Sequence, residues 1–223
     1  MTRVKICGLM NQRDINLCVQ AGVHMLGFVV DYTVPWNLEV SEARALMQQV
    51  PPFVSTCMVT GGSVEKVLDL AEKTRPNVVQ LHYKETLEDV KGIAHGLTLR
   101  GIKTMKALRI GPDGKCDFEI TDPILAVRAL SETGISAILV DSYTESRPGG
   151  TGVLVNLTSF KMIQKESSLP VVLAGGLNPG NVFSLVHELH PYAIDVLTGV
   201  EETSDKKDPN KIAEFMKNVQ AAL

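Results

Sequence analysis

Short apolar runs rich in β-branched residues alternate along the chain with stretches in which apolar residues recur at helical spacing. The apolar runs are continuous and do not alternate with polar residues, which predicts strands of a parallel sheet covered on both faces. The predicted strands are Arg3–Cys7, Met25–Val30, Phe53–Val59, Val78–His82, Ile102–Leu108, Ala137–Asp141, Val171–Ala174 and Ala193–Val196.

The segments between these runs predict helices with one buried face. In one of them the apolar residues Val64, Val67, Leu68 and Ala71 are spaced three or four positions apart. Three helix starts are marked by a capping side chain followed by proline at the first helical position. These pairs are Asp122-Pro123, Asn178-Pro179 and Asp208-Pro209.

Eight strand–helix units in 223 residues average about 28 residues each, which is close to the size of one βα module. No Gly/Ser-rich linker or block of charge divides the chain. We therefore expect an α/β fold in which residues 1–223 form a single (β/α)8 TIM barrel domain. Periodicity alone leaves an open, doubly wound sheet as the alternative.

Charge and composition exclude several classes of partner. Lys and Arg number 22 against 25 Asp and Glu, a net charge of −3, so there is no basic surface for nucleic acid. No apolar run approaches the roughly 20 residues that span a bilayer, and the first residues do not resemble a signal peptide. We expect a cytoplasmic protein with a small-molecule partner, no membrane partner and no nucleic-acid partner.

The four cysteines are too scattered to predict a disulfide framework or a zinc site, and we expect no metal. Cys18 and Cys57 fall in predicted core segments, whereas Cys116 is predicted to lie in an exposed turn. Cys7 differs from them because it ends a predicted strand.

Polar residues end several of the predicted strands, where barrel enzymes carry their active sites. Each has a structural interpretation of its own, as a buried thiol, a hydrogen-bonded histidine or a loop cap. Five such groups on one rim are difficult to bury without a function, so together they predict a site. They are Cys7, His82, Arg109, Asp141 and Asp195.

Glycine-rich stretches follow the seventh and eighth predicted strands, at residues 174–180 and 197–201. Glycine lets backbone N–H groups approach an anion, and these two loops commonly hold phosphate in barrels. Either stretch alone also fits a simple turn, but the two together favour a phosphate site. A third stretch, Gly149–Gly152, is expected to lie over the site as a mobile loop.

Motifs along almost the whole chain resemble the phosphoribosylanthranilate isomerase family of tryptophan biosynthesis. The matching segments are Val4–Leu9 with Asp14, Ala21-Gly22, Leu26–Phe28, Val79–His82, Lys106–Arg109, Leu139–Ser142, Gly149–Gly152, Leu173–Asn178, Asp195-Val196 and Gly199–Glu201.

The resemblance implies an Amadori rearrangement of N-(5-phosphoribosyl)anthranilate by general acid and base catalysis, without a metal or organic cofactor. It makes Asp141 the acid and Cys7 the base, and we expect Lys5 to lower the thiol pKa toward neutrality. Asp141 must instead hold a proton near pH 7, through burial or a negative neighbour such as the substrate phosphate. The resemblance also implies substrate contacts from Lys5, His82, Arg109 and Asp195. It further implies a phosphate site of Gly175, Gly176, Thr198 and Gly199.

Three segments of the chain depart from the family pattern. Trp36 stands where the family carries an arginine for the anthranilate carboxylate, a role that Arg109 or Arg147 could take over. Trp36 itself either stacks on an aryl group or covers apolar residues of its own loop. Val155-Asn156-Leu157 replaces Phe-Asp-Trp, and Leu197-Thr198 replaces Ser-Ser.

These departures leave two alternatives open. One is a divergent isomerase of another phosphorylated aminosugar. The other is a catalytically silent barrel that binds a phosphometabolite, although the retained Cys7 and Asp141 argue against silence. A monomer and a homodimer both remain compatible with the sequence.

Overall fold

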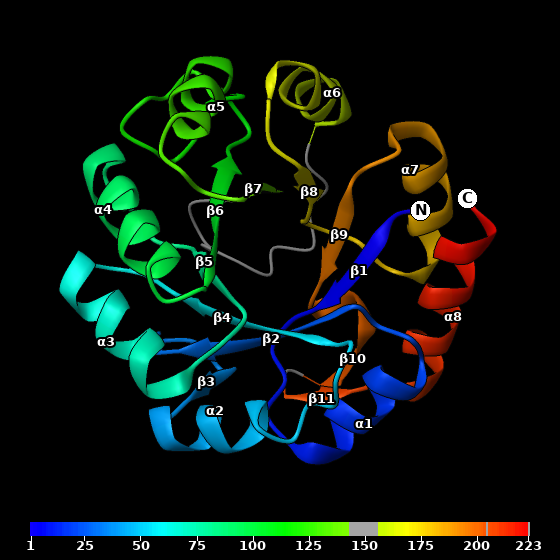
Figure 1. Ribbon diagram of the computed structural model, residues 1–223. Helices are drawn as coiled ribbons and strands as arrows, with labels where there is room; N and C mark the ends of the chain where they lie inside the picture. The colour runs from blue at the N-terminus through cyan, green and yellow to red at the C-terminus, as the bar shows by residue number, and fades with distance from the viewer. Residues whose placement is uncertain (143–155, 204, 223) are drawn as a thin grey trace.

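The protein is a closed barrel of parallel strands surrounded by helices, as a computed structural model describes for residues 1–142, 156–203 and 205–222. Among these residues eight strands form the ring, and β1 closes it by pairing with both β2 and β9 (Figure 1). The closed ring confirms the predicted (β/α)8 barrel and excludes the alternative of an open sheet. Its strands are β1 (Arg3–Ile6), β2 (Met25–Val30), β4 (Ser55–Thr60), β5 (Val78–Leu81), β6 (Lys103–Ile110), β7 (Ala137–Ser142), β8 (Val171–Leu173) and β9 (Ala193–Val196).

The helices lie outside the ring, between successive strands (Figure 1). The three predicted proline starts are confirmed, because Asp122, Asn178 and Asp208 each cap a helix through their side chains. None of the helices in the described part of the chain is long and apolar enough to cross a membrane. They are α1 (Gln12–Gln20), α2 (Val40–Met47), α3 (Val64–Thr74), α4 (Leu87–Thr98), α5 (Pro123–Ser131), α6 (Leu157–Glu166), α7 (Pro179–Leu189) and α8 (Pro209–Ala221).

The ends of the predicted strands shift by up to two residues. Phe53 was predicted to open a strand, but it lies fully exposed with φ at +72°, and β4 begins at Ser55. Three short strands were not predicted: β3 (Asn37–Leu38) beside β2, and the antiparallel pair β10 (Glu201–Thr203) and β11 (Lys206–Lys207). A short helical turn, η1 (Thr198–Val200), follows β9.

Two apolar layers position the site. The larger lies between strands and helices, and the smaller fills the barrel with inward side chains such as Val29, Leu139 and Val172.

Cys18 and Cys57 are buried, as predicted. The prediction for Cys116 is wrong: its thiol is buried and donates to the carbonyl oxygens of Ile120 at 3.1 Å and Thr121 at 3.2 Å. The loop after β6 folds back onto the barrel there and does not protrude.

Candidate active site

Cys7 directly follows β1, and its backbone N–H donates to the carbonyl of Val196 on β9 at 2.9 Å. A glycine is required opposite the thiol, because a Cβ on Gly27 would lie 2.7 Å from Sγ of Cys7. The thiol is therefore enclosed by the backbone of β2 and by neighbouring side chains of the barrel interior.

Lys5 and Asp195 form a buried ion pair beneath Cys7. They are in register on β1 and β9, and the distance from Nζ to Oδ2 is 2.7 Å. Burial alone would lower the pKa of Lys5, but the attraction of Asp195 and of the thiols of Cys7 and Cys57 raises it instead. Lys5 is consequently a fixed positive charge inside the barrel.

The pKa of Cys7 moves opposite to the prediction. Lys5 does pull it downward, but burial raises it more strongly, and Asp195 adds to the increase. The sequence argument identified the cation but could not reveal the carboxylate that is paired with it. Deprotonation of this thiol is therefore opposed by burial and by Asp195, and Lys5 offsets part of that opposition.

Asp141 lies near the end of β7, where its Oδ1 accepts a hydrogen bond from the backbone N–H of Ser142 at 2.8 Å. Burial, followed by repulsion from Asp195, raises the pKa of Asp141 to about 7. The carboxyl can therefore hold a proton near neutral pH, as an acid requires. The negative neighbour is a residue of the protein, where the sequence argument named a substrate phosphate as an example.

His82 directly follows β5, and its side chain lies close to that of Asp141. Its Nε2 lies 3.8 Å from Oδ2 of Asp141, and its Nδ1 lies 3.2 Å from the amide nitrogen of Gln80. Its carbonyl accepts from the hydroxyl of Tyr32 at 2.5 Å. Burial, together with the charges of Arg109, Lys106 and Lys5, lowers the pKa of His82 to about 3.

Arg109 lies on β6 in register with Asp141 on β7, and it forms an ion pair with Asp117 in the following loop. Lys84 contacts the other oxygen of Asp117 at 3.1 Å. The sequence analysis did not identify Asp117, although its position eight residues after Arg109 places it in the loop that follows β6. This pairing fixes the guanidinium at the rim, beside the acid.

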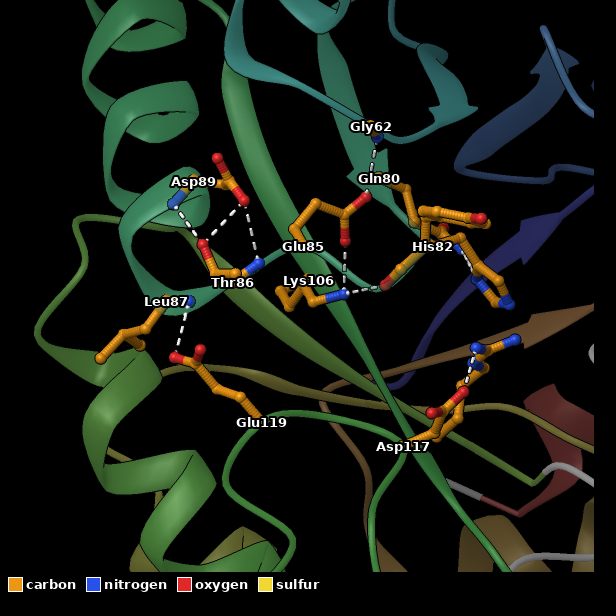
Figure 2. Close-up of polar contacts among 12 residues, drawn as sticks. Gly62, Gln80, His82, Glu85, Thr86, Leu87, Asp89, Lys106, Asp117 and Glu119 are labelled. Carbon is orange, nitrogen blue, oxygen red and sulfur yellow. Dashed lines mark hydrogen bonds and ion pairs between the residues drawn. The ribbon is translucent and has the colours of Figure 1, made fainter.

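Glu85 and Lys106 form a second buried ion pair, 2.6 Å long, that links two strand–helix loops to strand β6 (Figure 2). Lys106 also donates to the carbonyl of Tyr83 at 2.8 Å, and Glu85 accepts from the backbone N–H of Gly62 at 3.2 Å. The loops after β4 and β5 are thereby tied to β6. Lys106 was only part of a motif in the sequence analysis, and Glu85 was not identified at all.

The two glycine-rich loops lie against each other. A Cβ on Gly199 would come within 1.9 Å of the carbonyl oxygen of Leu177, and Gly175 and Gly176 both have positive φ, at +83° and +65°. The side-chain amides of Asn178 and Asn181 donate to the carbonyl of Gly176 at 3.2 and 2.9 Å. This fixes the backbone that leads into α7.

Thr198 is exposed at the start of η1, in the second of these loops. The predicted phosphate-binding residues therefore lie in two loops that are in contact. Gly149–Gly152, Arg147 and Val155 lie outside the described residues.

Trp36 covers the mouth of the barrel near Gly8. Its ring would be 3.0 Å from a Cβ on Gly8, and its Nε1 donates to Oε1 of Glu201 at 2.8 Å. The same oxygen accepts from Lys207 at 2.8 Å. The ring packs against the apolar cluster inside the barrel, as Leu197 also does, so the observed contacts correspond to a cover over apolar residues of the barrel interior.

The described residues contain no group of three or more side chains suited to hold a metal ion. Chemically, the site offers a carboxyl that titrates near neutrality, a thiol beside a buried cation, and two glycine loops. Such a set can give a proton at one point of a small molecule, remove one at another, and bind an anion.

Comparisons with known proteins point to one family. A model of the N-(5'phosphoribosyl)anthranilate (PRA) isomerase family matches residues 4–218. The N-(5'-phosphoribosyl)anthranilate isomerase of Methanosarcina acetivorans is 34% identical over 223 residues, covering 98% of this chain and 93% of that protein.

Solved structures agree. A phosphoribosyl anthranilate isomerase from Thermotoga maritima superposes with a TM-score of 0.83 at 32% identity, covering 99% of this chain and 100% of that one. A phosphoribosyl anthranilate isomerase in complex with reduced 1-(o-carboxyphenylamino)-1-deoxyribulose 5-phosphate gives a TM-score of 0.80 at 31% identity, with coverage of 99% and 100%.

Proposed function

The chain belongs to the N-(5'-phosphoribosyl)anthranilate isomerase family and isomerises phosphoribosylanthranilate in tryptophan biosynthesis, and on this basis we propose that Asp141 is its general acid and Cys7 its general base. The proposal covers the residues and their roles. It rests on one structural relationship: both side chains are buried at the same rim and both interact with the Lys5–Asp195 pair.

In the first step the Asp141 carboxyl protonates the ring oxygen of the furanose. The bond from that oxygen to C1 breaks, and the lone pair of the anthranilate nitrogen forms a C1=N iminium. The Asp141 pKa of about 7 supports this role, because a fraction of the carboxyl carries a proton at neutral pH. The substrate nitrogen supplies the electrons, so this step needs no cofactor.

In the second step the Cys7 thiolate removes the proton from C2, and the C2–H electron pair forms an enolamine as the iminium is neutralised. The enolamine then takes a proton at C1, its C2 hydroxyl releases a proton to solvent, and the product is the ketone, 1-(2-carboxyphenylamino)-1-deoxyribulose 5-phosphate. Lys5 supports this step, since its charge favours the thiolate.

The remaining site residues hold the substrate in this proposal. Asp195 Oδ1 is buried without a hydrogen-bond partner in the described residues, which suits it to accept from a sugar hydroxyl. His82, Arg109 and Lys5 contribute polar contacts around the sugar and the aglycone. The phosphate lies against Gly175, Gly176, Thr198 and Gly199, where small residues let it approach the backbone.

The assembly is proposed to be a homodimer, on the ground that a Thermotoga maritima relative of 28% identity is described as dimeric. Sedimentation at twice the chain mass of 24.2 kDa supports the dimer, and sedimentation at the chain mass contradicts it.

The proposed location is the cytoplasm, because a phosphorylated substrate is charged and does not cross membranes unaided. Cell fractionation tests this.

The catalytic roles are tested by generating phosphoribosylanthranilate in situ and following the loss of its fluorescence. We expect Cys7→Ala and Asp141→Asn each to lower kcat by at least about 100-fold. Cys57→Ala is the matched control, since it removes another buried thiol of the barrel interior and should retain activity. Turnover that survives both site substitutions would show that the assigned acid and base are wrong.

A further inference from the structure

Gln80 lies on β5 two residues before His82, so both side chains point toward the barrel interior. The amide nitrogen of Gln80 lies 3.2 Å from Nδ1 of His82. An amide nitrogen donates hydrogen bonds and accepts none. With the amide placed in this way, Gln80 donates to Nδ1, which then carries no proton.

The other ring nitrogen then holds the single proton of the neutral imidazole. His82 is neutral because burial and the surrounding cations lower its pKa to about 3. Its Nε2 faces Oδ2 of Asp141 at 3.8 Å, and a carboxylate attracts an N–H group placed there. The contacts at the two ends of the ring thus favour the same tautomer.

We propose that Gln80 is a positioning residue that holds His82 as the Nε2–H tautomer, so that His82 donates toward the carboxylate formed when Asp141 releases its proton. The inference rests on the proposed role of Asp141 as the acid. His82 keeps its own proton throughout, and the proton that reaches the ring oxygen comes from Asp141 alone.

The opposite tautomer would impair the reaction. A lone pair on Nε2 would accept the proton of Asp141 in a hydrogen bond and turn it away from the substrate. With Nε2–H in place, the protonated acid has no acceptor on this side. The carboxylate produced by transfer gains a donor once the 3.8 Å separation shortens to hydrogen-bond distance.

The tautomer is measured directly by long-range proton–nitrogen NMR of the whole protein labelled with nitrogen-15 histidine, with His82→Leu to assign the signals. We expect a pyrrole-type signal from Nε2 and a pyridine-type signal from Nδ1. A pyrrole-type Nδ1, or two protonated nitrogens, would overturn the proposal. This readout does not depend on the role of Asp141, whose failure would instead appear as activity in Asp141→Asn.

Kinetics test the consequence. Gln80→Met keeps the side-chain length and removes the donor, so the two nitrogen signals should move toward each other and kcat should fall about tenfold with KM nearly unchanged. Thr104→Val is the control, because it removes a buried hydroxyl on the adjacent strand β6 that has no hydrogen-bond partner among the described residues. A Gln80→Met protein with wild-type signals and wild-type kcat would contradict the proposal.

A second pair of variants keeps the test independent of Gln80. His82→Gln can place an amide N–H near the position of Nε2, whereas His82→Leu cannot donate. We expect His82→Leu to lower kcat by about 100-fold and His82→Gln to recover about tenfold of that loss. Equal activities of the two variants would count against donation from Nε2.

Discussion

The Nζ of Lys5 lies 2.7 Å from Oδ2 of Asp195 inside the barrel, and this one ion pair acts on both Cys7 and Asp141. Burial raises the pKa of both groups, Asp195 raises both further, and Lys5 opposes the increase. The acid and the base therefore share one electrostatic environment, and a change at the ion pair shifts the pKa of both groups.

Replacing Lys5 with methionine should make the Cys7 thiol less reactive. Loss of the cation removes the main charge that lowers the thiol pKa, so a smaller thiolate fraction remains at a given pH. Alkylation of Cys7 by iodoacetamide, followed by peptide mass spectrometry, should be slower than in the wild type. Lys206→Met, which breaks an exposed pair with Glu202, should leave the rate unchanged. Equal rates in Lys5→Met and wild type would refute the role of Lys5.

The pH profile should reflect both groups, because Asp141 must be protonated while Cys7 is ionised. Asp141 titrates at about 7 and the pKa of Cys7 is raised above its ordinary value, so the fraction of enzyme in this state increases up to about pH 7 and is level above it. The predicted measurement is a kcat/KM profile with an acidic limb that ends near pH 7 and an alkaline limb only where the thiol titrates. A profile that already declines as the pH rises through about 7 would be inconsistent with this acid and base.

Folding stability should depend on the same group. The folded pKa of Asp141 is raised, so the folded state binds more protons than the unfolded state between about pH 4 and about pH 7. This contribution is fully present below the unfolded pKa and is lost as the pH rises through the folded pKa. Urea unfolding at pH 5 and pH 8 should show a loss of at most about 3 kcal/mol from this group. The loss should be much smaller in Asp141→Asn.

Removing one partner of the Glu85–Lys106 pair should lower the free energy of unfolding more than removing both charges does. Lys106→Met leaves the Glu85 carboxylate buried without its cation, which should cost about 3–5 kcal/mol of unfolding free energy. Adding Glu85→Gln removes that charge and should restore part of the loss. Denaturant unfolding of the single and double variants measures this coupling, and additive effects would argue against it.

The barrel could be predicted from the sequence because each strand is a local apolar run, and the helix starts have local caps. The site could be predicted only in part. Cys7, His82, Arg109, Asp141 and Asp195 are marked by their positions at strand ends.

Their partners have no such local mark. Lys5 and Asp195 are 190 residues apart, and Trp36 and Glu201 are 165 apart. The sequence suggested that a cation would lower the Cys7 pKa, but the opposing burial and the Asp195 charge depend on tertiary packing. Gln80 was only part of a motif in the sequence, because its significance comes from its contact with the ring of His82.

Trp36 is the single tryptophan of the chain, so its fluorescence reports on the mouth of the barrel. Trp36→Phe removes the N–H that donates to Glu201, and Lys207 still holds that carboxylate. We expect a stability loss of only about 1 kcal/mol.

In the wild type, titration with the reduced product analogue should change the tryptophan fluorescence with saturation. A signal unchanged at saturation would place Trp36 away from the bound ligand.

A substrate deuterated at C2 tests most directly whether Cys7 removes the proton from that carbon. Wild-type enzyme should release the deuterium to solvent with a primary isotope effect. Both Cys7→Ala and Asp141→Asn should retain the label, because one lacks the base and the other cannot open the ring. Release of the label by Cys7→Ala at the wild-type rate would contradict the account.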